Sequence, residues 1–502
     1  MGENLSNLTT DTEIKFKLKE LSKHGMIYGI GAVLNSLLGF VLIPLYTSKF
    51  TPDIYGVFSL ITLVGILMGS VFYLGSSSSL VRYYYDNNTK EERINTINSA
   101  LFLVLIGAIS QIIIGILLSK FISILIFSTE IYSNHIIISL CSSSFSFINI
   151  TYLLLLRYDN KSTTYVLLNA STFVLSFILV LLFFYLDMGL YAPFLGLALG
   201  QLSLTVFLII YYSKYSFISF SKEVLKIHLR YGLPIAISSL IFYLLEWSDR
   251  FFIKEMCSLN EVGIYSYGYK LAMMIHTLIV IPFSLIWSQI RMKYKNDKNA
   301  DRLITLVTTY FSVICLLIIY CLSIFSREIV LLTSGKESYY LAQNIIPIIA
   351  IAQYLYGLSN ILDYGIAISK KTKFILYTGL TALIINIALN YFTISIWGIF
   401  AAAYSKLITY LIFIFLIYTI SSKTIKIKVE FKRLFVLCFV MIILLVMRNF
   451  LEISLLKEII LSKLLTIILL LSFLVFGFTN KKEKMLIFSF IKYKKYFGTS
   501  KK

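Results

Sequence analysis

The chain has 502 residues, of which 58% are hydrophobic and 14% are charged, and its mean hydropathy is +0.84. A soluble domain of this size cannot bury so much apolar surface, so repeated long apolar runs predict a polytopic membrane protein. The net charge of +20 is carried by short loops between apolar runs. This distribution argues against a basic nucleic-acid-binding face and matches the positive-inside pattern of membrane proteins.

The first 24 residues are polar and include acidic side chains. They contain no apolar core next to a small-residue cleavage site, so we expect no cleaved signal peptide. The first apolar run that follows is then expected to direct membrane insertion.

Apolar runs of about 20 residues continue along the rest of the chain and predict an all-α membrane protein with about fourteen transmembrane helices. The connections between the runs are short, and no soluble domain fits between them. The runs cover residues 25–46, 55–78, 97–119, 134–156, 163–186, 191–212, 231–253, 262–288, 303–326, 340–368, 374–392, 396–420, 433–450 and 459–479.

The positions of Lys and Arg predict the orientation of these spans. With a cytoplasmic N-terminus, 34 of the 45 basic residues lie in inside segments, 9 at outside positions and 2, Lys270 and Lys406, within spans. Cytoplasmic loops are enriched in Lys and Arg, so both termini are expected to be cytoplasmic in a multi-pass protein of the inner (plasma) membrane. The five cysteines show no paired spacing and are interpreted as small membrane-buried residues rather than disulfides or metal ligands.

The chain also repeats itself at an offset of 207 residues. Lys23-His24-Gly25-Met26 aligns with Arg230-Tyr231-Gly232-Leu233, and Gly56-Val57-Phe58-Ser59 aligns with Gly263-Ile264-Tyr265-Ser266. Six spans separate the copies, so both have the same orientation, which predicts a parallel repeat with substrate at the interface between the halves.

The repeat, the apolar runs and the basic loops together predict a division of the chain into six parts. These are a cytoplasmic N-terminal segment 1–24, a six-helix lobe 25–212, a cytoplasmic linker 213–230, a second six-helix lobe 231–420, two further helices in 421–479 and a basic cytoplasmic tail 480–502.

The motifs at the start of each half resemble the polysaccharide (O-antigen repeat-unit) flippases. In the first half these are LIPLYT at 42–47, TPDIYG at 51–56 and RYYY at 82–85. In the second half they are YGLP at 231–234, SDR at 248–250, and EVGIYS at 261–266 followed by Tyr269-Lys270. The resemblance implies membership of the superfamily that also holds multidrug antiporters and lipid II flippases. It also implies two lobes around a central cavity and alternating access for an undecaprenyl-diphosphate-linked oligosaccharide, for O-antigen or other lipopolysaccharide synthesis.

Charged residues inside the spans are the candidate substrate-binding residues, because such groups are usually kept only where they face a bundle interior or a wet cavity. Arg250 and Lys270 lead, since a guanidinium and an ammonium suit a diphosphate, and Lys406 is a third candidate. Glu246 lies four residues before Arg250, so the two can instead form a structural ion pair. Asp249 points elsewhere and is expected to meet Lys270. Arg250 lies near a helix end, where its side chain can also extend to the interface.

Two further residues are candidates for coupling to an ion. Asp363, toward the inner end of its span, can relay a proton or Na⁺, and His276 lies near midplane depth, where a histidine can take up a proton near neutral pH. For both residues a hydrogen-bonded packing role is the favoured alternative.

No nucleotide-binding loop, metal-ligand cluster, nucleophile elbow or paired-carboxylate motif is found, so the sequence predicts a non-enzymatic transporter without cofactor, metal or catalytic residues. The expected partners are the lipid-linked oligosaccharide, membrane lipids and, as further candidates, a polymerase and a chain-length regulator, with no nucleic acid. A multidrug or cation antiporter of the same superfamily is the alternative, although its cavity should be acidic. A polysaccharide polymerase fits less well, because it requires a large loop or a catalytic domain.

Overall fold

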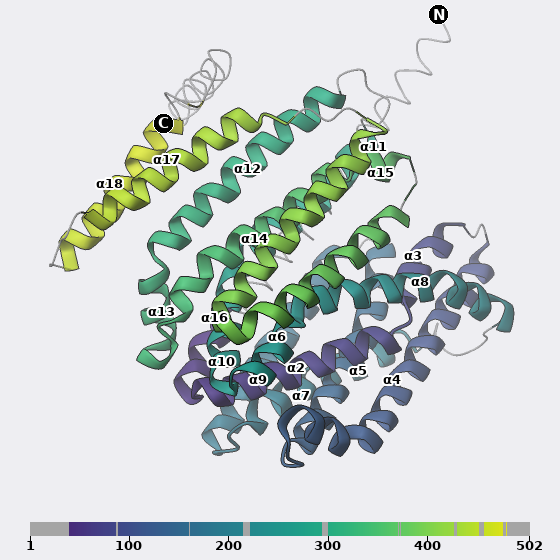
Figure 1. Ribbon diagram of the computed structural model, residues 1–502. Coiled ribbons are helices and arrows are strands. Elements are labelled where there is room, and N and C mark those ends of the chain that lie inside the picture. Colours follow the sequence, from purple (N-terminus) through teal and green to yellow (C-terminus); the bar gives the residue numbers. More distant parts are fainter. Residues whose placement is uncertain are drawn as a thin grey trace, which may run out of the picture.

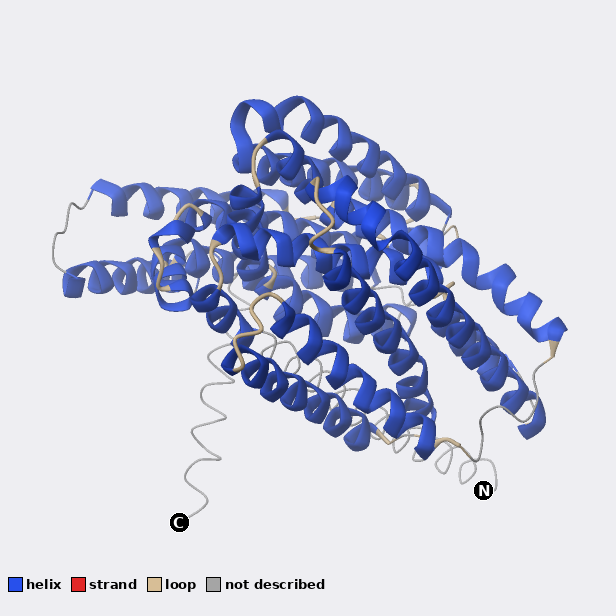
Figure 2. Ribbon diagram, turned by 90° about the horizontal axis from the view of Figure 1, so that it is seen from below, coloured by secondary structure: helices blue, strands red, loops and turns tan. Residues whose placement is uncertain are grey.

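The computed structural model describes residues 40–86, 89–159, 161–213, 221–293, 300–369, 371, 373–425, 429–450, 456–474 and 478. These residues form helices joined by short turns, and no strand occurs among them (Figures 1 and 2). In the first half, residues 40–49 are helical and are followed by α2 (Pro52–Phe72), α3 (Ser76–Asp86), α4 (Lys90–Phe127), α5 (Ser133–Tyr158), α6 (Ser162–Tyr185) and α7 (Tyr191–Tyr211).

The second half continues with α8 (Lys222–Trp247), α9 (Asp249–Met256), α10 (Leu259–Ala272), the π-helical turn η1 (His276–Val280), α11 (Ile281–Lys293), α12 (Ala300–Ile324), α13 (Ser326–Ser334), the short 3-10 turn η2 (Glu337–Tyr339), α14 (Ala342–Leu362), α15 (Tyr364–Ile368) and α16 (Lys373–Ser422). Two more helices lie at the edge of the bundle: α17 (Phe431–Phe450) beside α12, and α18 (Leu456–Phe473) beside α17 (Figure 1).

Ten helices in the described part of the chain are long and apolar enough to cross a membrane. One of them, α16, contains two predicted spans, 374–392 and 396–420, while α17 and α18 cover the last two. The first predicted span, 25–46, lies mostly outside the described residues. The all-α architecture predicted from hydropathy is therefore present, and its outer surface is apolar: Leu117 and Leu125 on α4 are 73% and 65% exposed.

Local chemistry explains where several helices begin and end. The helix α4 begins with a capping box, in which Thr89 accepts from the Glu92 amide and Glu92 accepts from the Thr89 amide. It ends at Ser128, whose φ of 58° is left-handed. Inside α16, Gly398 has φ 56° and ψ −138°, a conformation that glycine adopts far more readily than other residues. The two halves of α16 fold back on each other at this residue, and Asn386 donates to Thr409 between them.

The helix α8 begins at Lys222, inside the segment 213–230 that the sequence predicts as a linker. The reason is that His228 is buried and its Nδ1 lies 2.7 Å from Ser79 Oγ of α3 in a hydrogen bond. The segment 222–230 is thus helical and anchored to the first half through His228, while six of its nine residues are exposed.

The two halves meet where α2 crosses α10, and the contacts there follow the 207-residue repeat. A Cβ on Gly56 would lie 2.2 Å from the Leu259 carbonyl oxygen, and a Cβ on Gly263 would lie 1.8 Å from the Pro52 oxygen. Because Gly56 is equivalent to Gly263 and Pro52 to Leu259, these are the same contact made twice. Reciprocal contacts of this kind are the property of an interface across a two-fold axis.

Side chains at equivalent positions also bond to each other at this crossing. Ser59 donates to Ser266 at 2.8 Å, and Asn260 donates to Asp53 at 2.9 Å, each pair being 207 residues apart. The Gly-apolar-aromatic-Ser motif of each half therefore lies on the axis between them, and glycine is needed because the two backbones touch.

Candidate functional site

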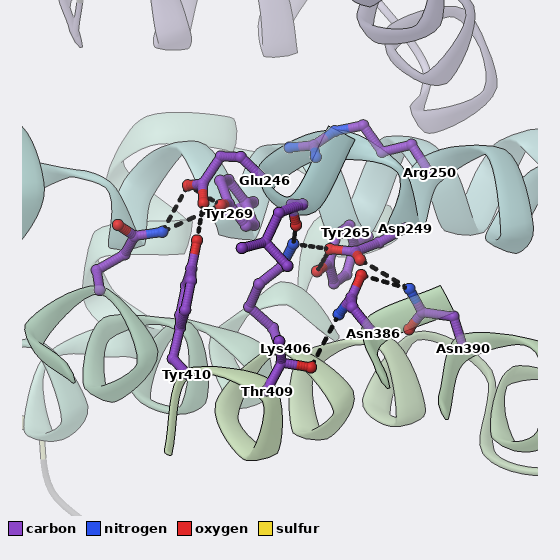
Figure 3. A network of polar contacts seen from close by, with 12 residues as sticks. Glu246, Asp249, Arg250, Tyr265, Tyr269, Asn386, Asn390, Lys406, Thr409 and Tyr410 are labelled. Atoms are coloured by element: carbon purple, nitrogen blue, oxygen red, sulfur yellow. Dashed lines mark hydrogen bonds and ion pairs between the residues drawn. The ribbon is translucent and has the colours of Figure 1, made fainter. Parts of the chain in front are cut away.

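The candidate site is built on the helical segment that carries Glu246, Asp249 and Arg250. The helix α8 ends at Trp247, and α9 starts at Asp249, with Ser248 between them. Ser248 has helical backbone angles, φ −63° and ψ −25°, and its carbonyl accepts from the amide of Phe251, three residues on, so the predicted span 231–253 tightens locally here and continues. Arg250 and Asp249 point in different directions from this segment (Figure 3).

Arg250 is 1% exposed and is held by aromatic rings rather than by a carboxylate. Its guanidinium carbon lies 4.3 Å from the Trp247 ring centroid and 4.5 Å from that of Tyr269. Its Nε donates to Ser266 Oγ at 3.1 Å, while its Nη1 has no hydrogen-bond partner among the described residues. Cation–π contacts stabilise the charge without neutralising it. The interpretation that Arg250 extends to the interface is wrong, because the side chain is enclosed.

Lys270 lies one helical turn after Ser266 and is exposed to a cavity that Arg250 also lines. The cavity measures about 410 Å³ and lies between residues of the first half, on α2, α6 and α7, and residues of α8 to α10. Its lining includes Ser59 and Thr62 of α2. Within the described part of the chain, Lys270 makes no hydrogen bond or ion pair, so its ammonium is available to a ligand.

Glu246 does not pair with Arg250. Its carboxylate accepts hydrogen bonds from the hydroxyls of Tyr269 and Tyr410 and, at 2.7 Å, from Gln353 Nε2 (Figure 3). The ion pair between Glu246 and Arg250, which the sequence left open as an alternative, is therefore absent: three neutral donors satisfy the carboxylate, while aromatic rings and Ser266 hold the guanidinium.

Asp249 pairs with Lys406, not with Lys270 as predicted. The Lys406 ammonium lies 2.9 Å from Asp249 Oδ2 and also donates to the Leu245 carbonyl, and both side chains are 0% exposed. Tyr265 and Asn390 each donate to Asp249 at 2.9 Å. The pair lies between α8–α9 and α16, whereas Arg250 points away from it (Figure 3). Neither residue belongs to the cavity lining, so the structure places both outside the cavity that the sequence predicts for them.

The two ion-coupling candidates also lie outside this lining. Asp363 forms an ion pair with Arg291 at 2.8 Å, on helix segments far along the chain from Arg250. His276 begins the π-helical turn of η1, its ring centroid is 5.6 Å from that of Tyr356, and its Nδ1 has no partner among the described residues. Each is embedded in protein, as the packing interpretation predicts.

Sequence reasoning did not predict the aromatic support of the site. Trp247, Tyr265 and Tyr269 surround Arg250, and Tyr410 and Gln353 join Glu246. In a chain with 36 Tyr and 39 Phe, composition alone does not distinguish these rings. Three residues around Arg250 had a signal: Ser266, which the repeat aligns with Ser59, and Tyr265 and Tyr269, which lie in the motifs that carry the family resemblance.

Comparison with protein families matches residues 21–288 to the polysaccharide biosynthesis protein family and residues 234–392 to the MatE family. Comparison with curated proteins gives no match. Among solved structures, the lipid II flippase MurJ in an inward closed conformation has a TM-score of 0.74 and 16% identity, covering 89% of this chain and 98% of that one.

Two MATE multidrug transporters are also similar in fold. An inward-facing structure has a TM-score of 0.65 and 14% identity, covering 80% of this chain and 97% of the transporter. An outward-facing structure has a TM-score of 0.58 and 16% identity, covering 80% and 95%. At these identities the likeness shows a shared fold, and the chemistry must be argued from the residues.

Proposed function

Because the chain belongs to the polysaccharide biosynthesis protein family, in the superfamily that also holds MATE transporters and lipid II flippases, we propose that it is a flippase for lipid-linked oligosaccharides. In this proposal it moves undecaprenyl-diphosphate-linked repeat units from the cytoplasmic to the outer leaflet of the inner membrane by alternating access. Both termini are cytoplasmic, which the distribution of Lys and Arg supports.

One observation carries the proposal: two cations, Arg250 and Lys270, share a cavity between the two halves, and its described lining contains no carboxylate. An anion in this cavity gains charge-assisted hydrogen bonds, and it does not compete with an acidic side chain of the protein for the two cations. The unpaired ammonium of Lys270 is the donor that reaches the cavity, and the enclosed guanidinium of Arg250 adds a second positive charge to its lining. A diphosphate, with its several anionic oxygens, matches two cations better than a single carboxylate does.

The lipid tail of such a substrate does not need an internal site. It can remain in the bilayer at a lateral opening while the diphosphate and glycan enter the cavity between the halves. The fold is consistent with a role in transport rather than catalysis, and the proposal assigns no catalytic residue, cofactor or metal to the chain. A polymerase and a chain-length regulator are proposed partners, because flipped units must be polymerised on the other side.

The MatE match over residues 234–392 favours a second candidate, a multidrug antiporter. Organic cations are the usual ligands of an acidic cavity, whereas Lys270 and Arg250 would repel them. If ion coupling occurs, Asp363 and His276 remain its candidate residues in either proposal.

The test replaces Lys270 with Ala in cells and measures lipid-linked glycan in each leaflet. Loss of a charge-assisted contact worth about 1.5–3 kcal/mol should slow flipping by about ten- to a hundredfold, with lipid-linked units retained on the cytoplasmic leaflet at unchanged protein level. Lys120→Ala is the matched control, since Lys120 is 71% exposed and forms a surface pair with Glu130.

Normal leaflet distribution in Lys270→Ala cells would remove Lys270 from the site. Loss of resistance to organic cations, with normal glycan export, would instead support the antiporter. Accumulation of lipid-linked units on the outer leaflet would support a polymerase.

A further inference from the structure

A second cavity lies beside the one that holds Arg250 and Lys270, and it is polar but uncharged. It measures about 410 Å³ and is enclosed by α2, α5, α7 and α8. Thr62, Ile66, Leu197 and Trp247 line both cavities, so the two adjoin each other. Its volume falls in the range of about 300–1,000 Å³ typical of small-ligand sites.

The polar wall of this cavity comes mainly from four serines of α5, Ser139, Ser142, Ser143 and Ser146. Ser139 and Ser143 use their hydroxyls on the backbone, donating to Ile61 and Leu140 at 3.1 and 3.0 Å. In contrast, Ser142 and Ser146 have no hydrogen bond to any residue in the described part of the chain. Because they are four residues apart, their hydroxyls lie on one face of α5 and are available to a ligand.

Gln201 of α7 adds an oriented amide to the same wall. Its Oε1 accepts from Asn149 Nδ2 at 2.9 Å, which fixes the amide plane and leaves the NH₂ group for a ligand oxygen. The neighbouring cavity of about 220 Å³ shares Ser146 and Gln201 and continues past Asn149 toward Asn169 and Thr172 of α6. The uncharged polar lining thus extends into the interior of the first half.

Aromatic side chains complete the lining. Phe147, Phe194, Tyr243 and Trp247 line the cavity, and no Asp, Glu, Lys or Arg is among its described lining residues. A lining that combines flat apolar rings with hydroxyls and an amide suits a molecule with one apolar face and a hydroxylated edge, which describes a sugar ring. A charged sugar would lose its hydration here without gaining an ion pair, and that loss is costly.

We propose that this cavity binds an uncharged sugar, the unit joined directly to the diphosphate, while the diphosphate lies on Arg250 and Lys270. The inference rests on the proposed function and deepens it by naming the sugar class. Trp247 connects the two ligand groups, because its ring lies against the Arg250 guanidinium and it lines both cavities. The protein then selects glycolipids by the absence of charge on this first sugar.

The experiment measures equilibrium binding of three radiolabelled lipids to the purified full-length protein in lipid nanodiscs. The lipids are polyprenyl diphosphate, the same lipid bearing one N-acetylhexosamine, and the same lipid bearing one hexuronic acid. Two to three neutral hydrogen bonds, each contributing about 0.5–1.5 kcal/mol, should make the N-acetylhexosamine lipid bind about tenfold tighter than the bare lipid. The hexuronic acid lipid should show no such gain.

Ser146→Leu fills the sugar cavity and should abolish the tenfold gain while leaving the affinity for bare polyprenyl diphosphate unchanged. Ser203→Leu is the matched control, because Ser203 is an exposed residue of α7 two positions after Gln201. The double variant Ser142→Ala/Ser146→Ala removes only the two hydroxyls. It replaces Ser146→Leu in the test if the leucine variant does not fold.

The outcomes separate the two proposals. Equal affinity for bare and N-acetylhexosamine lipids, an equal gain from hexuronic acid, or a gain that survives both serine variants would overturn the sugar cavity and leave the flippase proposal standing. Failure of the wild-type protein to bind bare polyprenyl diphosphate in a Lys270-dependent manner would overturn the flippase proposal itself.

Discussion

At the scale of single residues, burial and partners divide three membrane-embedded ions, Lys406, Asp249 and Lys270, into two roles. Lys406 and Asp249 are both 0% exposed and bond to each other, to a backbone carbonyl, to Tyr265 and to Asn390. Lys270 has the same chemistry as Lys406 but is open to the cavity and unpaired among the described residues. The Lys406–Asp249 pair therefore holds α8–α9 against α16, whereas Lys270 is available to bind a ligand.

Replacing Lys406 with Met should be strongly destabilising, because it leaves the Asp249 carboxylate buried without a cation. Breaking a buried pair in this way typically costs about 3–5 kcal/mol, whereas replacing both partners is often nearly neutral. Thermal unfolding in detergent should therefore show a large loss for Lys406→Met and a substantial recovery in Lys406→Met/Asp249→Asn. Lys270→Met is the control and should unfold like the wild type. Equal losses in the single and double variants would contradict the structural role.

At the scale of elements, the crossing of α2 and α10 is set by two glycines at equivalent repeat positions. Gly56 and Gly263 let the backbones approach until the Pro52 and Leu259 carbonyls lie where a Cβ would be. The close approach brings Ser59 against Ser266, and Ser266 in turn accepts from Arg250. The position of the guanidinium thus depends on how closely two helices from different halves can pack.

Gly263→Ala should push α2 and α10 apart, since the added Cβ would lie 1.8 Å from the backbone oxygen of Pro52. Overpacking of this kind typically costs about 1–3 kcal/mol, and here it also displaces Ser266 from Arg250. Gly379→Ala is the matched control, because its nearest contact, at 3.2 Å, is the end of the Phe242 side chain. We expect a lower unfolding temperature in detergent for Gly263→Ala alone; similar melting of both variants would show that the crossing tolerates a methyl group.

At the scale of the whole molecule, the two halves enclose the proposed site and also contact each other on both sides of it. The α2–α10 crossing closes one end, and Gly75 contacts Gly232 at the other, near the hydrogen bond between Ser79 and His228. The cavity that Arg250 lines lies between these contacts. Passage of a glycolipid head group requires one of the two contacts to open.

A disulfide across the α2–α10 crossing should block transport if the halves separate there. The hydroxyls of Ser59 and Ser266 are 2.8 Å apart, so Ser59→Cys/Ser266→Cys, in a background without the five native cysteines, should oxidise readily. Export of lipid-linked glycan should stop on oxidation and return on reduction, while each single-cysteine variant stays active. Full export with the disulfide quantitatively formed would show that this crossing does not open.

Most of the fold could be predicted from the sequence. The length and spacing of the apolar runs predict the spans, because a helix in lipid must satisfy its own backbone over about 20 residues. The 207-residue repeat, read from two short motifs, identified the residues that meet between the halves, since a two-fold axis places equivalent residues together. The choice of Arg250 and Lys270 also follows from the sequence, because isolated cations in apolar helices are rare and need a polar environment.

Only the tertiary structure decided which charges pair and which remain available. The sequence leaves a pair of Glu246 with Arg250 open and expects Asp249 to meet Lys270, yet Glu246 accepts from two tyrosines and a glutamine, and Asp249 pairs with Lys406. A spacing of four residues makes two side chains possible neighbours on a helix but does not decide which partner each one takes. Partners on distant helices, 157 residues away for Asp249, are determined by packing, which no local pattern encodes.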